Sequence, residues 1–169
     1  MKESAYLDGQ HHLVERIKLL PAFAAFGDNR LRELLRLCKI RSYAAGESII
    51  QEGEEERCMY FLLSGSVQIS KGGKAVSTLR RTGDIFGEMS LVDGAPRFAS
   101  VRALGETTCL AVDAAQLEKP GGKDHAAFQA AIYQMFAQIL TARLRVTTVN
   151  YLQARQELEQ LKKAVPSPS

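Results

Sequence analysis

The sequence predicts a mainly β protein with flanking helices, built around a β jelly roll. Between residues 39 and 118 the apolar residues fall in short alternating runs, and glycines separate these runs at regular intervals. From Asp124 to about Ala164, by contrast, the chain contains neither glycine nor proline. Many short strands joined by glycine turns are typical of an antiparallel barrel or jelly roll, and the uninterrupted stretch predicts a long helix after it.

The N-terminal segment, residues 1–38, is expected to be helical. Leu13, Ile17 and Leu20 share one face at helical spacing. Asp28 is a favourable N-cap for a second helix that follows it.

The jelly-roll segment, residues 39–118, is expected to contain several strands. They are predicted at 48–51, 58–63, 66–71, 75–79, 97–103 and 107–112. Residues 119–164 are expected to form the C-terminal helical region, and residues 165–169, which read VPSPS, are expected to be disordered.

The long C-terminal helix carries a heptad seam. Its members are Ala137, Leu140, Leu144, Thr147, Tyr151, Ala154, Leu158 and Leu161. A 3-4-3-4 spacing sustained over this length calls for a partner helix, so a homodimer through residues 137–161 is expected. The alternative is a helix that packs on its own domain. Thr147 is polar, and it either fixes the register or, with Thr148, faces a ligand trapped between the helix and the barrel.

Composition and charge narrow the class of function. The content of 46% hydrophobic and 24% charged residues is ordinary for a soluble globular protein. The net charge of +3 comes from residues 121–169, where six basic side chains are spread along a helix, so direct nucleic-acid binding is not expected. No apolar run approaches the roughly 20 residues of a membrane span, and the N-terminus does not resemble a signal peptide. Cys38, Cys58 and Cys109 are expected to be buried free thiols in a reducing cytoplasm.

No catalytic or metal centre is predicted. His11, His12 and His125 all lie outside the β region, so a jelly-roll metalloenzyme lacks its histidine ligands. The glutamate run, Glu52 and 54–56, is interpreted as a solvated loop rather than a metal site. The chain is therefore expected to be a binding protein and not an enzyme.

The most informative stretch is residues 83–100, GDIFGEMSLVDGAPRFAS. Gly87 allows close approach of the backbone to a ligand, and Glu88 begins a short helical turn whose free N–H groups favour an anion. Arg97 supplies a forked cation that matches two phosphate oxygens. Glu88 suits a ribose hydroxyl, so the stretch predicts a compact ligand with both a sugar hydroxyl and a phosphate. The alternative is that Arg97 is a surface arginine paired with Asp93 or Glu88.

Residues 83–84 (GD), 86–91 (FGEMSL) and 96–100 (PRFAS) resemble the phosphate-binding cassette of cyclic nucleotide-binding domains. This is the module of the catabolite activator protein and of protein kinase A regulatory subunits. Glycines and apolar residues farther upstream follow the family's order and spacing, so the resemblance covers roughly residues 18–150. It implies a cyclic nucleotide as the ligand.

The resemblance also implies a role for each cassette residue. Glu88 takes the ribose 2′-hydroxyl, and Arg97 holds the cyclic phosphate together with backbone N–H groups near Ser90. Phe86 and Met89 line the pocket.

A second resemblance lies in residues 143–148 (RLRVTT), which are similar to a stretch in the dimer helix of the catabolite activator protein. It implies that Thr147 contacts the base within its own protomer and that Thr148 reaches across the dimer. Arg143 is then expected near the phosphate end of the pocket. Family members have two helices in this region, which implies a break near the start of the predicted long helix.

Phe98 departs from the family pattern, because the residue after the cassette arginine is usually small. Phe98 has no hydroxyl to hold phosphate or a guanine amino group, so weak affinity and a preference for cAMP over cGMP are expected. Alternatively its ring fills the pocket, and the chain is a non-binding dimerisation scaffold. No helix-turn-helix follows the long helix here, so the output is expected to pass to a protein partner. The alternative is that the chain is the isolated sensory half of a transcription regulator of the catabolite activator type.

Overall fold

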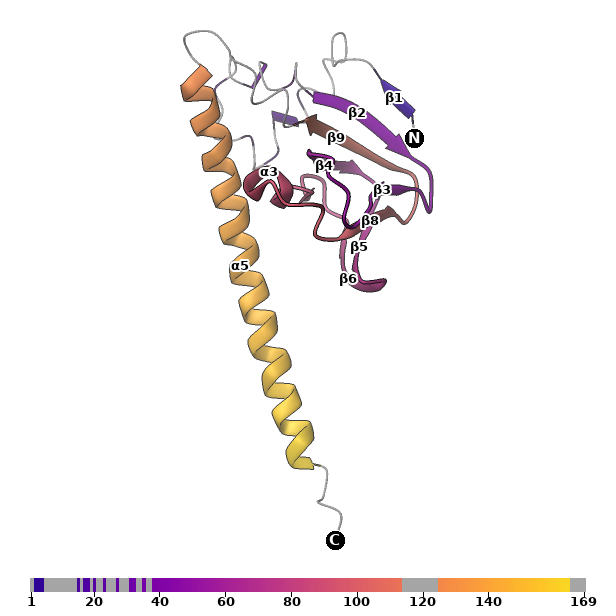
Figure 1. Ribbon diagram of the computed structural model, residues 1–169, viewed down its shortest axis with the longest axis vertical. Helices are drawn as coiled ribbons and strands as arrows, with labels where there is room; N and C mark the ends of the chain where they lie inside the picture. The colour runs from indigo at the N-terminus through magenta and orange to yellow at the C-terminus, as the bar shows by residue number, and fades with distance from the viewer. Residues whose placement is uncertain are drawn as a thin grey trace. The chain divides into compact units, whose positions relative to one another are not determined.

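A computed structural model describes residues 38–113 and 125–164, together with residues 2–4, 15, 17–18, 20, 23, 27, 31–32 and 35. The chain forms two compact units, Met1–Ala131 and Ile132–Ser169. The first unit contains the strands, and the second contains most of the long helix (Figure 1).

The first sheet of the β unit has five strands. They are β1 (Lys2–Ser4), β2 (Cys38–Tyr43), β4 (Cys58–Ser64), β7 (Ile85–Phe86) and β9 (Thr107–Asp113). The order is β1-β2-β9-β4-β7, and every neighbouring pair is antiparallel. Strands β2 and β9, far apart in the sequence, lie side by side along the whole of β2 (Figure 1).

The second sheet has four strands. They are β3 (Ser48–Ile50), β5 (Val67–Lys71), β6 (Lys74–Leu79) and β8 (Ser100–Ala103). The order is β3-β8-β5-β6, again antiparallel throughout. Because consecutive strands such as β2 and β3, or β4 and β5, lie in different sheets, the chain crosses repeatedly from one sheet to the other. The predicted mainly β, jelly-roll architecture is confirmed.

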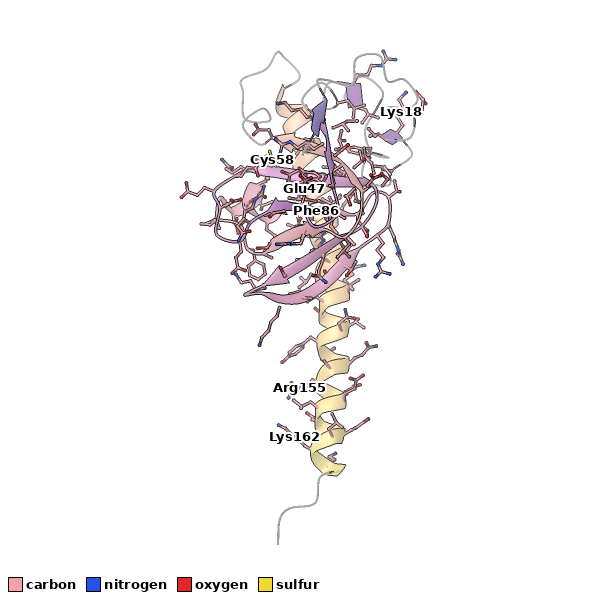
Figure 2. All side chains as sticks on the ribbon, turned by 90° about the vertical axis from the view of Figure 1, so that its right-hand side faces the viewer. Lys18, Glu47, Cys58, Phe86, Arg155 and Lys162 are labelled. Carbon is pink, nitrogen blue, oxygen red and sulfur yellow. The ribbon has the colours of Figure 1, made fainter. Side chains whose placement is uncertain are left out.

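One hydrophobic core joins the two sheets. Its buried members are Tyr43, Ile49, Ile50, Cys58, Tyr60, Leu62, Val67, Phe86, Val101, Ala103, Cys109 and Ala111. Cys58 and Phe86 are marked in Figure 2. Strand β4 is buried on both faces, because its outward Phe61 ring packs 4.7 Å from the ring of Phe23, centroid to centroid. The three cysteines are buried free thiols, which confirms the prediction.

The helices differ from the predictions in two respects. Helix α5 runs from His125 to Ala164 without interruption, so the break expected from the resemblance is absent within these residues. Strand β1 lies in the N-terminal segment, residues 1–38, which was expected to be helical, although the described residues within 15–18 and 31–35 are helical. Among the described helices, none is both long and apolar enough to cross a membrane. The disorder expected for 165–169 falls outside the described residues.

Each of the six predicted strands is present, and each end lies within three residues of the predicted position. The largest difference concerns the strand predicted to begin at Arg97, because β8 begins only at Ser100. Strands β2 and β7 were not predicted individually. Strand β7 has only two residues, Ile85 and Phe86, which is too short to show a period.

Candidate functional site

The backbone at Arg97 is fixed by a loop that precedes β4. The Arg97 N–H donates to the Glu54 carbonyl at 2.8 Å, and the Gly53 N–H donates to the Arg97 carbonyl at 2.9 Å. Next along the loop, the Glu52 N–H donates to Ser100 Oγ at 2.9 Å. These bonds join the end of the cassette to the loop, so Arg97 cannot shift along the chain direction without breaking them.

The side chain of Arg97 is buried, with 3% of the residue exposed. Its Nη1 donates to the Gly87 carbonyl and to Ser90 Oγ, both at 2.8 Å, and its Nη2 donates to the Cys58 carbonyl. A guanidinium has five N–H donors, and these bonds use three of them. The alternative that Arg97 is a surface arginine, paired with Asp93 or Glu88, is wrong as to its position, because the side chain is buried.

The two remaining donors of Arg97 are the Nε–H and one N–H of Nη2, and these two nitrogens share one edge of the planar group. Nε is buried and has no hydrogen-bond partner among the described residues. A free edge of this kind is the geometry with which arginine binds two oxygens of a carboxylate or a phosphate. A buried donor without a partner is unfavourable in itself, so the site favours an anionic ligand.

Gly87 is required by the geometry around this arginine. Its φ is +77°, a region that side chains disfavour. A Cβ added to Gly87 would lie 2.9 Å from each of three atoms: Arg97 Nη1, the Cys58 carbonyl oxygen and Ile50 Cδ1. The hydrogen atom of glycine therefore makes room for the guanidinium.

Glu88 is the second buried charged residue of the cassette, with 1% exposed. It is the N-cap residue of helix α3 (Met89–Asp93) but makes no side-chain capping bond. Ser90, in the first turn, is buried against Arg97, whereas Met89 is 43% exposed. Phe86 is buried and stacks on Tyr60 with the ring centroids 5.1 Å apart. A carboxylate and a guanidinium buried in one short segment can accept from a hydroxyl and donate to an anion.

The side chain of Phe98 lies on the surface, although Phe98 directly follows the buried Arg97. It is 58% exposed, and the Lys71 ammonium lies 4.5 Å from the centroid of its ring. Lys71 is held there by Glu52, whose Oε1 is 2.9 Å from Nζ. The structure thus places the ring on an exposed cation–π contact and gives no support to a pocket filled by Phe98.

The predicted site residues on the helix, Arg143, Thr147 and Thr148, lie on α5 in the second unit. Thr147 and Thr148 are exposed, and Arg143 is half-buried. Their participation in the ligand site stays a prediction.

Sequence reasoning missed Glu56 as a member of the site. Glu56 Oε2 lies 3.8 Å from Arg97 Nη2, and Glu56 Oε1 lies 3.3 Å from Arg41 Nη1. Arg41 Nη1 also donates to the Tyr60 hydroxyl at 2.9 Å. The glutamate run was a visible signal, but it was interpreted only as a solvated loop. Among the described residues no cluster of histidine, cysteine or carboxylate side chains is suited to a metal ion.

Burial dominates the proton equilibria around the site. It raises the pKa of the Cys58 thiol to about 12, and the Glu56 carboxylate adds to this effect. Burial also raises the pKa of the Tyr60 hydroxyl. Both groups are therefore neutral at physiological pH, and the charge in this region resides on Arg97, Arg41 and the nearby carboxylates.

Comparison with known proteins shows which family the β unit is similar to. Residues 40–119 match the family model described as "Cyclic nucleotide-binding domain". Over 88 residues, or 52% of the chain, the sequence is 39% identical to a cAMP-dependent protein kinase regulatory subunit of Debaryomyces hansenii, and the match spans 19% of that protein. The chain spans less than a third of the curated relatives it matches.

Solved structures agree with this match. A cyclic nucleotide-binding domain from Methylobacillus flagellatus has a TM-score of 0.69 at 23% identity, over 83% of this chain and 81% of that one. The catabolite activator protein of Thermus thermophilus has a TM-score of 0.62 at 26% identity, over 84% of this chain and 63% of that one.

Proposed function

We propose that residues 40–119, which form a cyclic nucleotide-binding domain, make this chain a cyclic nucleotide sensor. The observation that carries the proposal is the buried Arg97 guanidinium, which keeps one donor edge free among the described residues. A permanent cation with unused donors in the protein interior is stabilised by an anion that brings two acceptor oxygens. The cyclic phosphate supplies both oxygens.

In this proposal the cassette binds the sugar and the phosphate. Glu88 accepts a hydrogen bond from the ribose 2′-hydroxyl, and Arg97 holds the phosphate together with the N–H groups near Ser90. The buried position of Glu88 strengthens a bond to a hydroxyl, because water competes little there. Thr147 and Thr148 read the base. The chain acts by binding and has no catalytic role.

We propose cAMP rather than cGMP as the physiological ligand. Phe98 offers no hydroxyl to a guanine amino group, and its ring is engaged with Lys71. The relative from Debaryomyces hansenii is described as a cAMP-dependent kinase subunit, which is consistent with this choice.

The binding proposal is tested by titration calorimetry with cAMP and cGMP on the wild type, Arg97→Gln and Arg102→Gln. Arg102 is an exposed arginine on β8, so its replacement controls for the loss of one positive charge. Arg97→Gln is expected to raise the Kd for cAMP tenfold or more, since a charge-assisted bond contributes about 1.5–3 kcal/mol. Arg102→Gln is expected to stay within about twofold. Folded wild type that gives no heat at millimolar nucleotide contradicts the proposal.

We further propose that α5 joins two copies of the chain and transmits the signal to a protein partner. The larger apolar members of its heptad seam are exposed in the single chain: Leu144 by 67%, Tyr151 by 63%, Leu158 by 52% and Leu161 by 64%. Such a stripe is normally covered by a partner helix. Ligand shifts the helix equilibrium by its differential affinity for the two states.

The dimer is tested with Leu158→Lys against Gln153→Lys, which adds the same charge outside the seam. Sedimentation equilibrium is expected to give a monomer for the first and a dimer for the second and for the wild type. A monomeric wild type at high concentration contradicts the dimer and leaves nucleotide binding untouched.

A further inference from the structure

Glu56 stands between two arginines. One carboxylate oxygen is 3.8 Å from Arg97 Nη2 and the other is 3.3 Å from Arg41 Nη1. We infer that Glu56 sets the affinity of the site by competing with the bound phosphate for the Arg97 guanidinium. This inference rests on the proposed function.

The donors of Arg97 show where the competition occurs. Both N–H groups of Nη1 are used by Gly87 and Ser90, and one N–H of Nη2 is used by the Cys58 carbonyl. The other N–H of Nη2 and the Nε–H remain for a ligand. Glu56 lies beside Nη2, so its negative charge acts on the edge that a phosphate needs. At 3.8 Å the carboxylate attracts the cation without making a good hydrogen bond.

The route by which a ligand reaches the Arg97 guanidinium also points to Glu56. Only 2% of the Arg97 side chain is exposed, so a ligand reaches the guanidinium only after a neighbouring group moves. The Cys58 carbonyl belongs to strand β4 and cannot withdraw without breaking the sheet. The Glu56 side chain is 40% exposed and belongs to a loop. Glu56 is therefore the contact of Nη2 that a phosphate displaces.

Arg41 keeps Glu56 near the site after a phosphate has displaced it from Arg97. When Glu56 leaves Arg97, it keeps its ion pair with Arg41, which is itself anchored to the Tyr60 hydroxyl. The carboxylate thus stays near the site in both states. A phosphate on Arg97 then lies close to a second negative charge, and the repulsion between them lowers its affinity.

The size of the effect follows from this repulsion. The Glu56 carboxylate and a phosphate bound to the same guanidinium are separated by about 6 Å. At an effective dielectric constant of about 20, their repulsion lowers the binding free energy of the phosphate substantially. Partial exposure of Glu56 and screening by salt reduce it. Removal of the charge is expected to tighten nucleotide binding about tenfold, which corresponds to about 1.4 kcal/mol.

The test compares Glu56→Gln with Glu55→Gln by calorimetric titration with cAMP at low and high salt. Glu55 is the preceding exposed carboxylate, and it makes no ion pair with the described residues, so it controls for the change in net charge. Glu56→Gln is expected to lower the Kd about tenfold at low salt and less at high salt, and Glu55→Gln to change it less than about twofold. Glu56→Ala is expected to behave like Glu56→Gln. Circular dichroism confirms that each variant is folded.

The outcomes separate this inference from the proposed function. If wild type binds cAMP and Glu56→Gln binds equally or more weakly, Glu56 does not compete and the inference falls alone. An equal gain from Glu55→Gln also overturns it, because the effect is then one of net charge. If neither folded wild type nor folded Glu56→Gln binds, the proposed function fails and the inference fails with it.

Discussion

Replacement of Gly87 by alanine tests the packing around the cassette arginine most directly. The φ of +77° disfavours any side chain and costs roughly 1–2 kcal/mol for a non-glycine residue. The added methyl group also lies 2.9 Å from the Cys58 carbonyl oxygen and from Arg97 Nη1. Overpacking of this kind costs about 1–3 kcal/mol. The sum predicts a loss of about 2–5 kcal/mol in the free energy of unfolding.

Gly94→Ala is the matched control for Gly87→Ala. Gly94 ends helix α3 with a φ of +67°, and nothing lies within 4 Å of an added Cβ. Its replacement is expected to show the conformational cost alone, about 1–2 kcal/mol.

Urea unfolding of both variants and the wild type, at one protein concentration, measures the difference. Gly87→Ala is also expected to weaken binding of cAMP, because Arg97 must move, whereas Gly94→Ala leaves the arginine in place. If the free energies of unfolding of the two variants differ by less than about 0.5 kcal/mol, the close contacts around Gly87 do not hold the arginine in place.

Two further predictions concern protons. Burial raises the pKa values of Cys58 and Cys109 to about 12, so the folded protein is expected not to react with Ellman's reagent at mildly alkaline pH and to react fully in urea; labelling of the native protein would contradict this. The hydrogen bond from the Gly72 N–H, and secondly that from Lys71, lower the pKa of the Glu52 carboxyl below its ordinary value of 4.5. The stability from this group is therefore present above about 4.5 and lost as pH falls through the lower, folded pKa, so urea unfolding is expected to show wild type and Glu52→Gln converging in acid. A constant gap down to acid pH would contradict the assignment.

Local chemistry made the cassette predictable from the sequence. Glycine marks the left-handed turn at Gly87, and the spacing of Glu88 and Arg97 follows from a short helix and its connection. Phe86, which was predicted to line the pocket, is buried together with Ser90, whereas Met89, predicted for the same role, is 43% exposed. The exact start of β8 was not predictable, because the chain at Arg97 pairs with a loop about forty residues earlier.

The surroundings of the cassette depend on tertiary contacts that the sequence does not display. Nothing in a run of four glutamates within five residues tells which one contacts Arg97, and the structure selects Glu56. The orientation of Phe98 runs against hydrophobicity, since the arginine beside it is buried and the aromatic ring is exposed. The buried position of Arg97 is explained by the three acceptors that its guanidinium contacts, and the exposed position of Phe98 by the contact of its ring with the Lys71 ammonium.

The two backbone bonds between Arg97 and residues 53–54 also bear on how this domain can diverge. Because they involve only main-chain atoms, exchange of the side chains at Glu54 and Glu55 leaves these two bonds in place. A single inserted or deleted residue in that loop, however, would move the partner carbonyl by one position and rotate the arginine away from its acceptors. Related sequences are therefore expected to vary in residue type at this loop but to keep its length.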